Sequence, residues 1–466
     1  MSKPLVLAVV GHTNVGKTSL LRTLLRDPEF GEVSPRPSTT RRVEGARLSV
    51  DGEPLIELYD TPGLEDAIGL LEYLERLPKP GERPDPPELL ARFLATGEAR
   101  LRFEQEVRVL RQLLLSDAGL YVIDAREPVL AKYRDELAVL AMCGKPLLPV
   151  LNFVASEGHR AEEWRTALAR IGLHALVRFD TVAPPVDGER RLYESLTLLM
   201  EEASPRLQRL IADLEAKARA RRRAAAQLIA GLLIDVAACR RSVPAQPELE
   251  RQAAQELREA VRARDQRCVD DLLRLYAFRP GDAEYDELPL LDGRWEHDLF
   301  NPETLRQLGI KVGGGMAAGA AAGATIDLLL GGASLGGAAL LGALAGGTAQ
   351  TARNYGQRLL GRFRGQRELT VEDPVLRLLA LRQLQLVRAL EARGHAASER
   401  LRLALPERSG WQGGELPGAV LRARAHPEWS ALNPGARLDL AERQLWQQRL
   451  AELLLAEIDP AAADSR

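Results

Sequence analysis

Hydrophobic positions divide the chain into two parts with different periodicities. Up to residue 203, short apolar runs alternate with stretches in which apolar residues recur every three or four positions. The runs predict strands at 5–10, 54–59, 119–124, 146–151 and 176–179. The stretches predict helices at 19–25, 98–115, 129–143 and 160–172, and the proline-dense stretch 78–88 predicts a loop. This alternation predicts an α/β domain with a mostly parallel sheet covered by helices on both faces.

From residue 204 onward the pattern changes to long helical stretches rich in Ala, Leu, Arg and Glu. We expect helices over 206–236, 373–393 and 436–457, with few strands between them. The sequence therefore predicts an N-terminal α/β domain, residues 1–203, and a mainly α-helical C-terminal domain, residues 204–466.

Composition indicates the cellular compartment more clearly than it indicates the function. A net charge of −2 over 466 residues predicts neither binding to nucleic acid nor an acidic partner. The three cysteines are scattered and do not have the spacing of a metal site, which is typical of a reducing compartment. Together with a start that does not resemble a signal peptide, this indicates a cytoplasmic protein.

The first strand leads into a glycine-framed loop that fits the pattern G-x-x-x-x-G-K-[ST]. We expect the loop and the start of the following helix to bind nucleotide phosphates through Gly11, His12, Thr13, Asn14, Val15, Gly16, Lys17, Thr18 and Ser19. In such a loop, backbone N–H groups and a helix N-terminus converge on phosphate oxygens. Lys17 would reach the β- and γ-phosphates, and Thr18 would hold Mg²⁺.

A second loop supports the first. The strand at 54–59 is followed by Asp60-Thr61-Pro62-Gly63. An acidic residue at such a strand end can hold Mg²⁺ through water, and Gly63 can give its N–H to a γ-phosphate. Between the two loops, residues 34–42 are rich in proline and hydroxyl groups, and a threonine there would complete the magnesium shell only while the γ-phosphate is present.

Residues 4 to about 200 resemble a P-loop GTPase domain of the Era/TrmE type, on the strength of the two loops and of Thr39–Arg41. The resemblance implies that Thr40 is the switch magnesium ligand and takes part in hydrolysis with Lys17 and Gly63. It also implies that Asn14 helps to hold K⁺ beside the phosphates, where the ion would stand in for an arginine finger. The alternative for Asn14 is a loop residue that caps its own backbone.

One departure from this family concerns hydrolysis. Leu64 stands where Ras-like enzymes place a water-orienting glutamine, and leucine cannot orient water. We therefore expect slow hydrolysis. Glu72 is a positional candidate for the missing role, and an exposed helix glutamate is the alternative.

The second departure concerns the base. The family reads guanine with N-K-x-D, but here the strand at 146–151 ends in Asn152-Phe153-Val154-Ala155. Alanine accepts none of the hydrogen bonds that the family aspartate accepts from guanine. Phe153 could stack on the base, and Asp180 could supply an acceptor or merely cap a turn. Either guanine is bound with reduced selectivity or other purines are accepted.

The C-terminal half contains a glycine- and alanine-rich segment, residues 312–352, with glycines at four-residue spacing. We expect a helical hairpin that either enters the membrane or packs as a soluble helix pair. Arginines and lysines flank both ends, so an inserted hairpin would keep both ends in the cytoplasm. A basic cluster within 217–223 could bind anionic lipid or RNA, or could be a solvated helix face.

These features together predict a GTP/GDP-binding protein with slow, Mg²⁺-dependent and K⁺-activated hydrolysis that switches the helical half. The alternatives are a degenerate GTPase that binds nucleotide or a membrane partner without turnover, and a purine-promiscuous NTPase. The location is cytoplasmic, with peripheral or inserted association with the inner membrane through 312–352 as an option. RNA is a partner only by resemblance, and no protein partner can be named.

Overall fold

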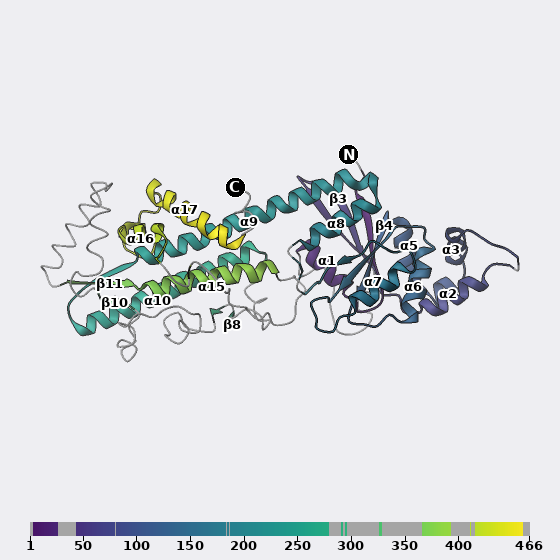
Figure 1. Ribbon diagram of the computed structural model, residues 1–466, viewed down its shortest axis with the longest axis horizontal. Coiled ribbons are helices and arrows are strands. Elements are labelled where there is room, and N and C mark those ends of the chain that lie inside the picture. Colours follow the sequence, from purple (N-terminus) through teal and green to yellow (C-terminus); the bar gives the residue numbers. More distant parts are fainter. Residues whose placement is uncertain are drawn as a thin grey trace. The chain divides into compact units, whose positions relative to one another are not determined.

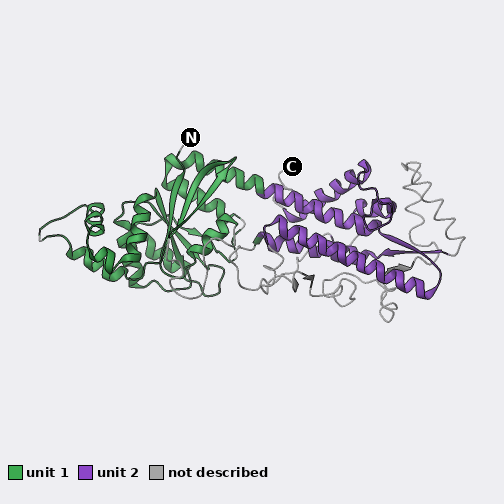
Figure 2. Ribbon diagram, turned by 180° about the vertical axis from the view of Figure 1, so that it is seen from behind, with its two compact units in different colours: residues 1–217, 392–398 green, residues 218–391, 399–466 purple. Residues whose placement is uncertain are grey.

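The computed structural model describes residues 3–26, 43–79, 81–182, 184–185, 187–278, 290–291, 294–295, 326–328, 366–392, 411 and 415–459. The chain forms two compact units (Figure 2). Unit 1 comprises residues 1–217 with 392–398, and unit 2 comprises 218–391 with 399–466. The first division falls after Lys217, inside a long helix, and the domain boundary after residue 203 stays a prediction.

Unit 1 is built on a six-stranded sheet with the strand order β2-β3-β1-β4-β5-β6 (Figure 1). Only β2 and β3 pair antiparallel, and the other neighbours are parallel. The strands are β1 (Leu5–Val10), β2 (Glu44–Val50), β3 (Glu53–Asp60), β4 (Ala118–Asp124), β5 (Leu147–Asn152) and β6 (Val177–Arg178). The predicted α/β fold is confirmed, and β2, a largely exposed edge strand, is the one that the sequence pattern missed.

Helices cover both faces of this sheet. They are α1 (Lys17–Leu25), α2 (Ala67–Arg76), α3 (Pro86–Leu94), α4 (Glu98–Leu101), α5 (Glu104–Leu115), α6 (Ala131–Ala141), α7 (Ala161–Ala169), α8 (Gly188–Leu199), the short η1 (Glu201–Ala203) and the start of α9 (Ser204–Ala238). Along β1, Leu7 and Val9 join a core with α1, α8 and α9, whereas Ala8 and Val10 join a core with α2, α5, α6 and α7. All six residues of β1 are buried because both faces are covered.

Two local predictions in unit 1 were wrong. The proline-dense stretch 78–88 was expected to be a loop, but α3 begins at Pro86. Proline is tolerated in the first turn of a helix, where its missing N–H has no intrahelical partner to lose. The helix expected over 98–115 is broken into α4 and α5, with the fully buried Phe103 at the break.

Unit 2 is mainly helical. Its helices are the rest of α9, α10 (Pro247–Leu275), α15 (Asp373–Ala392), α16 (Gly418–Arg424), the short η3 (Pro427–Trp429) and α17 (Ala441–Ile458). Its small sheet has the antiparallel order β10-β11-β7, with β10 (Ile326–Leu328), β11 (Gln366–Val371) and β7 (Arg240–Pro244), and β8 (Leu290–Leu291) pairs with β9 (Arg294–Trp295). The long helices confirm the prediction. The strands are short and do not alternate cleanly, which is why the pattern did not reveal them.

The segment 312–352 falls outside the described residues except at β10. At these three positions the backbone is extended and pairs with β11, so the predicted helix is wrong there. The pairing places Ile326 opposite Val371, and a β-branched residue favours extended backbone. In the described part of the chain, no helix is both long and apolar enough to cross a membrane.

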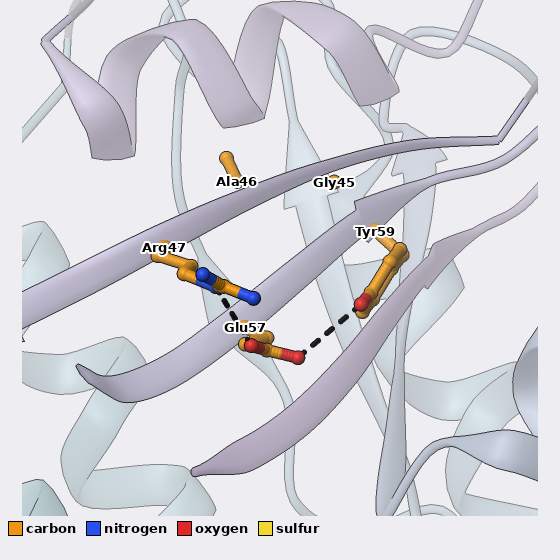
Figure 3. Close-up of a pocket in the computed structure, with 5 residues that line it drawn as sticks. All are labelled: Gly45, Ala46, Arg47, Glu57 and Tyr59. Atoms are coloured by element: carbon orange, nitrogen blue, oxygen red, sulfur yellow. Dashed lines mark hydrogen bonds and ion pairs between the residues drawn. The ribbon is translucent and has the colours of Figure 1, made fainter.

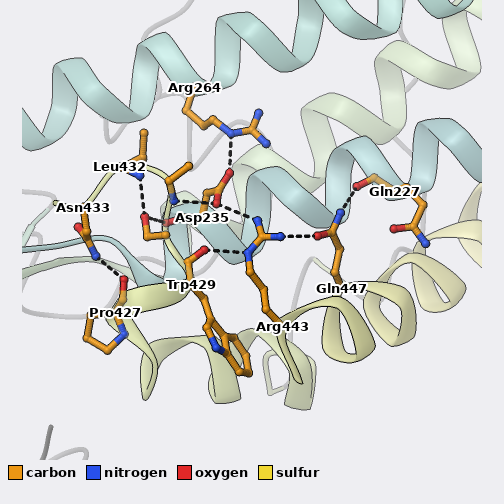
Figure 4. Close-up of polar contacts among 11 residues, drawn as sticks. Gln227, Asp235, Arg264, Pro427, Trp429, Leu432, Asn433, Arg443 and Gln447 are labelled. Carbon is orange, nitrogen blue, oxygen red and sulfur yellow. Dashed lines mark hydrogen bonds and ion pairs between the residues drawn. The ribbon is translucent and has the colours of Figure 1, made fainter. Parts of the chain in front are cut away.

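A buried polar network connects α17 and the loop before it to the other helices of unit 2 (Figure 4). Asp235 on α9 pairs with Arg264 on α10 at 2.8 Å and with Arg443 on α17 at 3.1 Å. It also accepts the backbone N–H of Ala431. Removing one arginine would leave a buried charge poorly paired, which typically costs ~3–5 kcal/mol. The network therefore fixes α17 and the loop before it to α9.

The basic cluster on α9 is largely engaged within the protein. Arg222 is half-buried, donating to Glu391 at 2.8 Å and to Asp459 at 2.6 Å. Lys217 pairs with Asp213 at 2.7 Å. These contacts favour the solvated and internally paired helix face over a surface for lipid or RNA.

Candidate functional site

A glycine, Gly16, connects the loop after β1 to helix α1. Gly16 has a φ of 90°, and a Cβ placed on it would lie 2.3 Å from Nδ2 of Asn152. Any side chain here would be strained and would collide with the end of β5. Helix α1 begins at the next residue without a side-chain cap, and the N-terminus of a helix attracts anions.

Lys17 is buried at the start of α1 and is held by the loop itself. Its Nζ donates to the carbonyl oxygens of His12 at 2.7 Å and Gly11 at 3.2 Å. Burial lowers the pKa of Lys17 to about 8, against the opposing influence of Asp60 and Glu136. A nearby polyanion would restore the charge, so this lysine is suited to phosphate.

Thr18 and Asp60 meet at the carboxyl end of the sheet. The Thr18 hydroxyl donates to Oδ2 of Asp60 at 2.5 Å. Burial raises the pKa of Asp60, while the Thr18 bond and the charge of Lys17 oppose the rise. Oδ1 of Asp60 is buried and has no hydrogen-bond partner among the described residues. A hydroxyl and a carboxylate with an unpartnered oxygen are the hard donors that suit Mg²⁺.

The segment after Asp60 is seated on the phosphate loop. Thr61 donates its hydroxyl to the Val9 carbonyl at 2.7 Å, and the Leu64 N–H donates to the Gly11 carbonyl at 3.3 Å. A Cβ on Gly63 would lie 2.4 Å from Oγ1 of Thr13, so only glycine fits. Leu64 is fully buried and therefore cannot face an attacking water.

The sequence reasoning missed a buried carboxylate beneath this loop. Glu136 on α6 is 1% exposed, contacts Nδ1 of His12 at 2.5 Å and accepts the Tyr121 hydroxyl at 2.9 Å. Lys132 lies 3.1 Å from the other ring nitrogen of His12. The signal was present, because Glu136 falls on the apolar face of a predicted helix, beside Tyr133 and Leu140.

A second missed carboxylate supports the start of α2. Glu106 on α5 is buried and accepts the backbone N–H groups of Glu65 at 3.1 Å and Asp66 at 3.0 Å. It therefore anchors the chain directly after Leu64. The pattern placed Glu106 on a helix but did not show which backbone it would hold.

On the base side, Asn152 ties three loops together. Its Nδ2 donates to the Val15 carbonyl at 2.9 Å, and its Oδ1 accepts from the N–H groups of Phe153 and Thr181, each at 2.9 Å. Phe153 has a φ of 58°, which is rare for a bulky residue. Its ring lies beneath the Arg126 guanidinium, 4.0 Å from the ring centroid, and Arg126 is paired to Asp124 at 2.7 Å.

Asp180 caps the turn that follows β6. Its two carboxylate oxygens accept the N–H groups of Ala155 at 2.8 Å and Val182 at 2.9 Å. The structure thus brings Asp180 to the altered N-K-x-D segment. These two contacts match the capping alternative, and a role as a guanine acceptor stays a prediction.

The remaining predicted residues are placed as follows. Asn14 is exposed with a left-handed φ of 62°, and Ser19 lies in the first turn of α1, where its carbonyl accepts from Thr23. Glu72 lies on α2 with its side chain 58% exposed, 3.5 Å from Arg76. This is the exposed helix glutamate of the alternative, so its water-orienting role lacks geometric support. Thr40 falls outside the described residues.

A separate pocket lies on the β2–β3 pair and contains no phosphate-loop residue (Figure 3). Its lining is Gly45, Ala46, Arg47, Glu57 and Tyr59. Glu57 accepts from Arg47 at 2.8 Å and from the Tyr59 hydroxyl at 3.2 Å. Its polar groups are thus satisfied by one another, and it has no evident reactive group.

Comparison with protein families assigns both parts of the chain. Residues 165–452 match the family described as "Domain of unknown function (DUF3482)". The chain belongs to this family. Residues 6–153 of this DUF3482 protein match the "50S ribosome-binding GTPase" family, so the predicted N-terminal P-loop GTPase domain is confirmed.

Curated relatives match limited parts of the chain. The chain is similar to the tRNA modification GTPase MnmE of Heliobacterium modesticaldum, at 29% identity over 35% of this chain and 33% of that protein. It is 41% identical to MnmE of Rhodopseudomonas palustris (strain BisB18) over 15% of each chain. It is 30% identical to GTPase Der of Chloroflexus aggregans over 31% of this chain and 26% of that protein. The DUF3482 chain therefore spans a third or less of these relatives.

Solved structures resemble the chain weakly. Era in complex with MgGDPNP and 16S ribosomal RNA is 21% identical, with a TM-score of 0.29, over 39% of this chain and 52% of that one. The G domain of T. maritima FeoB is 19% identical, with a TM-score of 0.25, over 42% of this chain and 98% of that one.

Proposed function

We propose that this DUF3482 protein binds GTP and GDP through unit 1 and hydrolyses GTP slowly. The arrangement of Lys17, Thr18 and Asp60 at the end of the parallel sheet supports this most directly. Lys17 is held by carbonyl groups of the loop, and the Thr18 hydroxyl donates to Asp60. This is the set of groups that a nucleoside triphosphate needs on its phosphate side.

Mg²⁺ would be held by Thr18 and Asp60, with Thr40 as the further predicted ligand, and it would neutralise charge on the phosphates. Lys17 and the N–H of Gly63 are proposed to contact the γ-phosphate. K⁺ beside Asn14 is the proposed substitute for an arginine finger, because Leu64 is buried and Glu72 is turned to solvent. Because no side chain among the described residues is evident for orienting water, we expect hydrolysis to be slow.

Base recognition favours a second candidate, a purine-promiscuous NTPase. Guanine-specific sites discriminate through buried hydrogen bonds, which reject a wrong partner by up to about 10⁵-fold. Ala155 offers no acceptor, and the oxygens of Asp180 already accept two N–H groups. Stacking on an aromatic ring contributes ~1–3 kcal/mol for any base and therefore separates purines poorly. We expect GTP to be preferred by no more than about tenfold over ATP.

We further propose that the nucleotide state of unit 1 switches the helical unit 2. Helix α9 is the supporting feature, because Leu207 and Leu210 belong to the core of unit 1 and Ile229 and Leu233 to the core of unit 2. A role at the membrane through residues 312–352 stays a prediction, as does a scaffold without turnover.

Phosphate release by the purified full-length protein tests this function. Wild type is compared with Lys17→Ala in potassium and in sodium buffer, each with Mg²⁺ and GTP or ATP. Slow release above the Lys17→Ala background, faster in potassium, is the expected result. Nucleotide binding without such release in either salt would leave the degenerate binding module.

A further inference from the structure

Four buried side-chain polar atoms of unit 1 lack a hydrogen-bond partner among the described residues: Thr13 Oγ1, Asp60 Oδ1, Thr181 Oγ1 and Tyr193 OH. Three of them lie at the carboxyl ends of β1, β3 and β6, where parallel sheets bind ligands. Asp60 already has a proposed partner in the magnesium shell. The hydroxyl of Thr13 has no part in the proposed function described so far.

A buried hydroxyl without a hydrogen-bond partner destabilises the protein, whereas valine has the same shape and carries no such cost. The position of Thr13 therefore calls for a ligand rather than for packing. Its Oγ1 lies against Gly63, since a Cβ on Gly63 would come within 2.4 Å of it and within 2.7 Å of the Thr13 nitrogen. The Thr13 hydroxyl and Gly63 are therefore neighbours at the edge of the sheet where the γ-phosphate is proposed to bind.

We propose that the Thr13 hydroxyl donates a hydrogen bond to the terminal phosphoryl group of the triphosphate and so favours GTP over GDP. This inference rests on the proposed nucleotide binding. It assigns to a side chain of the phosphate loop a part in γ-phosphate recognition, beside Lys17 and the N–H of Gly63. Because a diphosphate has no oxygen at this position, the contribution appears only with the triphosphate.

Equilibrium binding of a non-hydrolysable GTP analogue and of GDP to the full chain, both with Mg²⁺, tests the proposal. Thr13→Val removes the hydroxyl and keeps the shape, and Thr13→Ser restores the hydroxyl. Thr23→Val is the matched control, because the Thr23 hydroxyl donates to Ser19 O within α1. Thermal unfolding of each variant without nucleotide shows that it is folded.

A hydrogen bond to a charged group contributes ~1.5–3 kcal/mol, so Thr13→Val is expected to bind the analogue at least about tenfold more weakly. GDP binding should stay within about twofold, and Thr13→Ser should recover most of the loss. Unchanged analogue binding, or an equal loss for analogue and GDP, would overturn the proposal. If wild type binds neither nucleotide, the proposed function itself fails, and the wild-type measurement alone shows it.

Discussion

The phosphate side and the base side of the same site differ in how far they keep the family pattern. On the phosphate side, Lys17, Thr18, Asp60 and Gly63 lie together with the contacts that such a site needs. On the base side, Asn152 keeps its bonds to neighbouring loops, but Phe153 and Ala155 replace the residues that would read guanine. Asn152 therefore holds the neighbouring loops together, while Ala155 offers no hydrogen-bond acceptor for a base.

This difference separates affinity from specificity. Backbone N–H groups and a buried lysine bind any triphosphate, whatever base it carries. A hydrogen-bond acceptor on the base edge adds discrimination among purines. A chain that has the N–H groups and the lysine but lacks the acceptor for the base edge should bind nucleotides tightly and discriminate only weakly among their bases.

The largest expected effect is that of Lys17→Ala. It removes the buried cation that bonds to His12 and Gly11, and charge-assisted bonds to phosphate are among the strongest in proteins. We expect GTP, GDP and ATP to bind at least about 100-fold more weakly, equivalent to ~3 kcal/mol. Titration with a fluorescent nucleotide measures it, with the exposed Lys79→Ala as control. A loss of affinity for the guanine nucleotides alone, or for ATP alone, would contradict the division between a phosphate side and a base side.

Restoring the base side should have the next largest effect. Ala155→Asp returns a carboxylate to the position where the family accepts hydrogen bonds from guanine. We expect the preference for GTP over ATP to rise by about tenfold or more, because a buried acceptor penalises a base that cannot pair with it. Competition of labelled GTP by ATP measures the ratio, and Ala155→Asn provides a neutral control. An unchanged ratio would mean that the base is held elsewhere.

Nucleotide affinity should depend on pH through Lys17, whose pKa is about 8 in the nucleotide-free protein. Bound phosphates raise that pKa, so binding takes up a proton above pH 8 and none well below it. We expect affinity to be level below pH 7 and to fall by about tenfold per unit above pH 8. Lys17→Arg should remove the dependence, because arginine stays charged. A slope that persists in Lys17→Arg would assign the titration to another group.

Two glutamates give the smallest effects, and they differ from each other. Glu136→Gln weakens the buried contact to His12 and should lower stability by ~1–2 kcal/mol and affinity for every nucleotide by a few-fold. Glu72→Gln changes an exposed side chain and should leave phosphate release within about twofold of wild type. Thermal unfolding and phosphate release distinguish the two variants. A large loss of turnover in Glu72→Gln would support a water-orienting role for Glu72.

The sequence predicted the strands that lead into the site, because buried parallel strands are continuous apolar runs. It also predicted which residues of the phosphate loop and of Asp60–Gly63 come together, since loops after parallel strands meet at one edge of the sheet. It did not reveal Glu136 or Glu106, because a buried carboxylate depends on partners distant in sequence. For the same reason, the capping bonds of Asp180 could be offered only as an alternative.

Calorimetric titration of the full-length protein with GTP, with and without Mg²⁺, tests the central claim most directly. The account predicts uptake of one GTP per chain, strengthened by Mg²⁺ and abolished by Lys17→Ala. Absence of heat at high protein concentration with GTP and with ATP, in the presence of Mg²⁺, would contradict it.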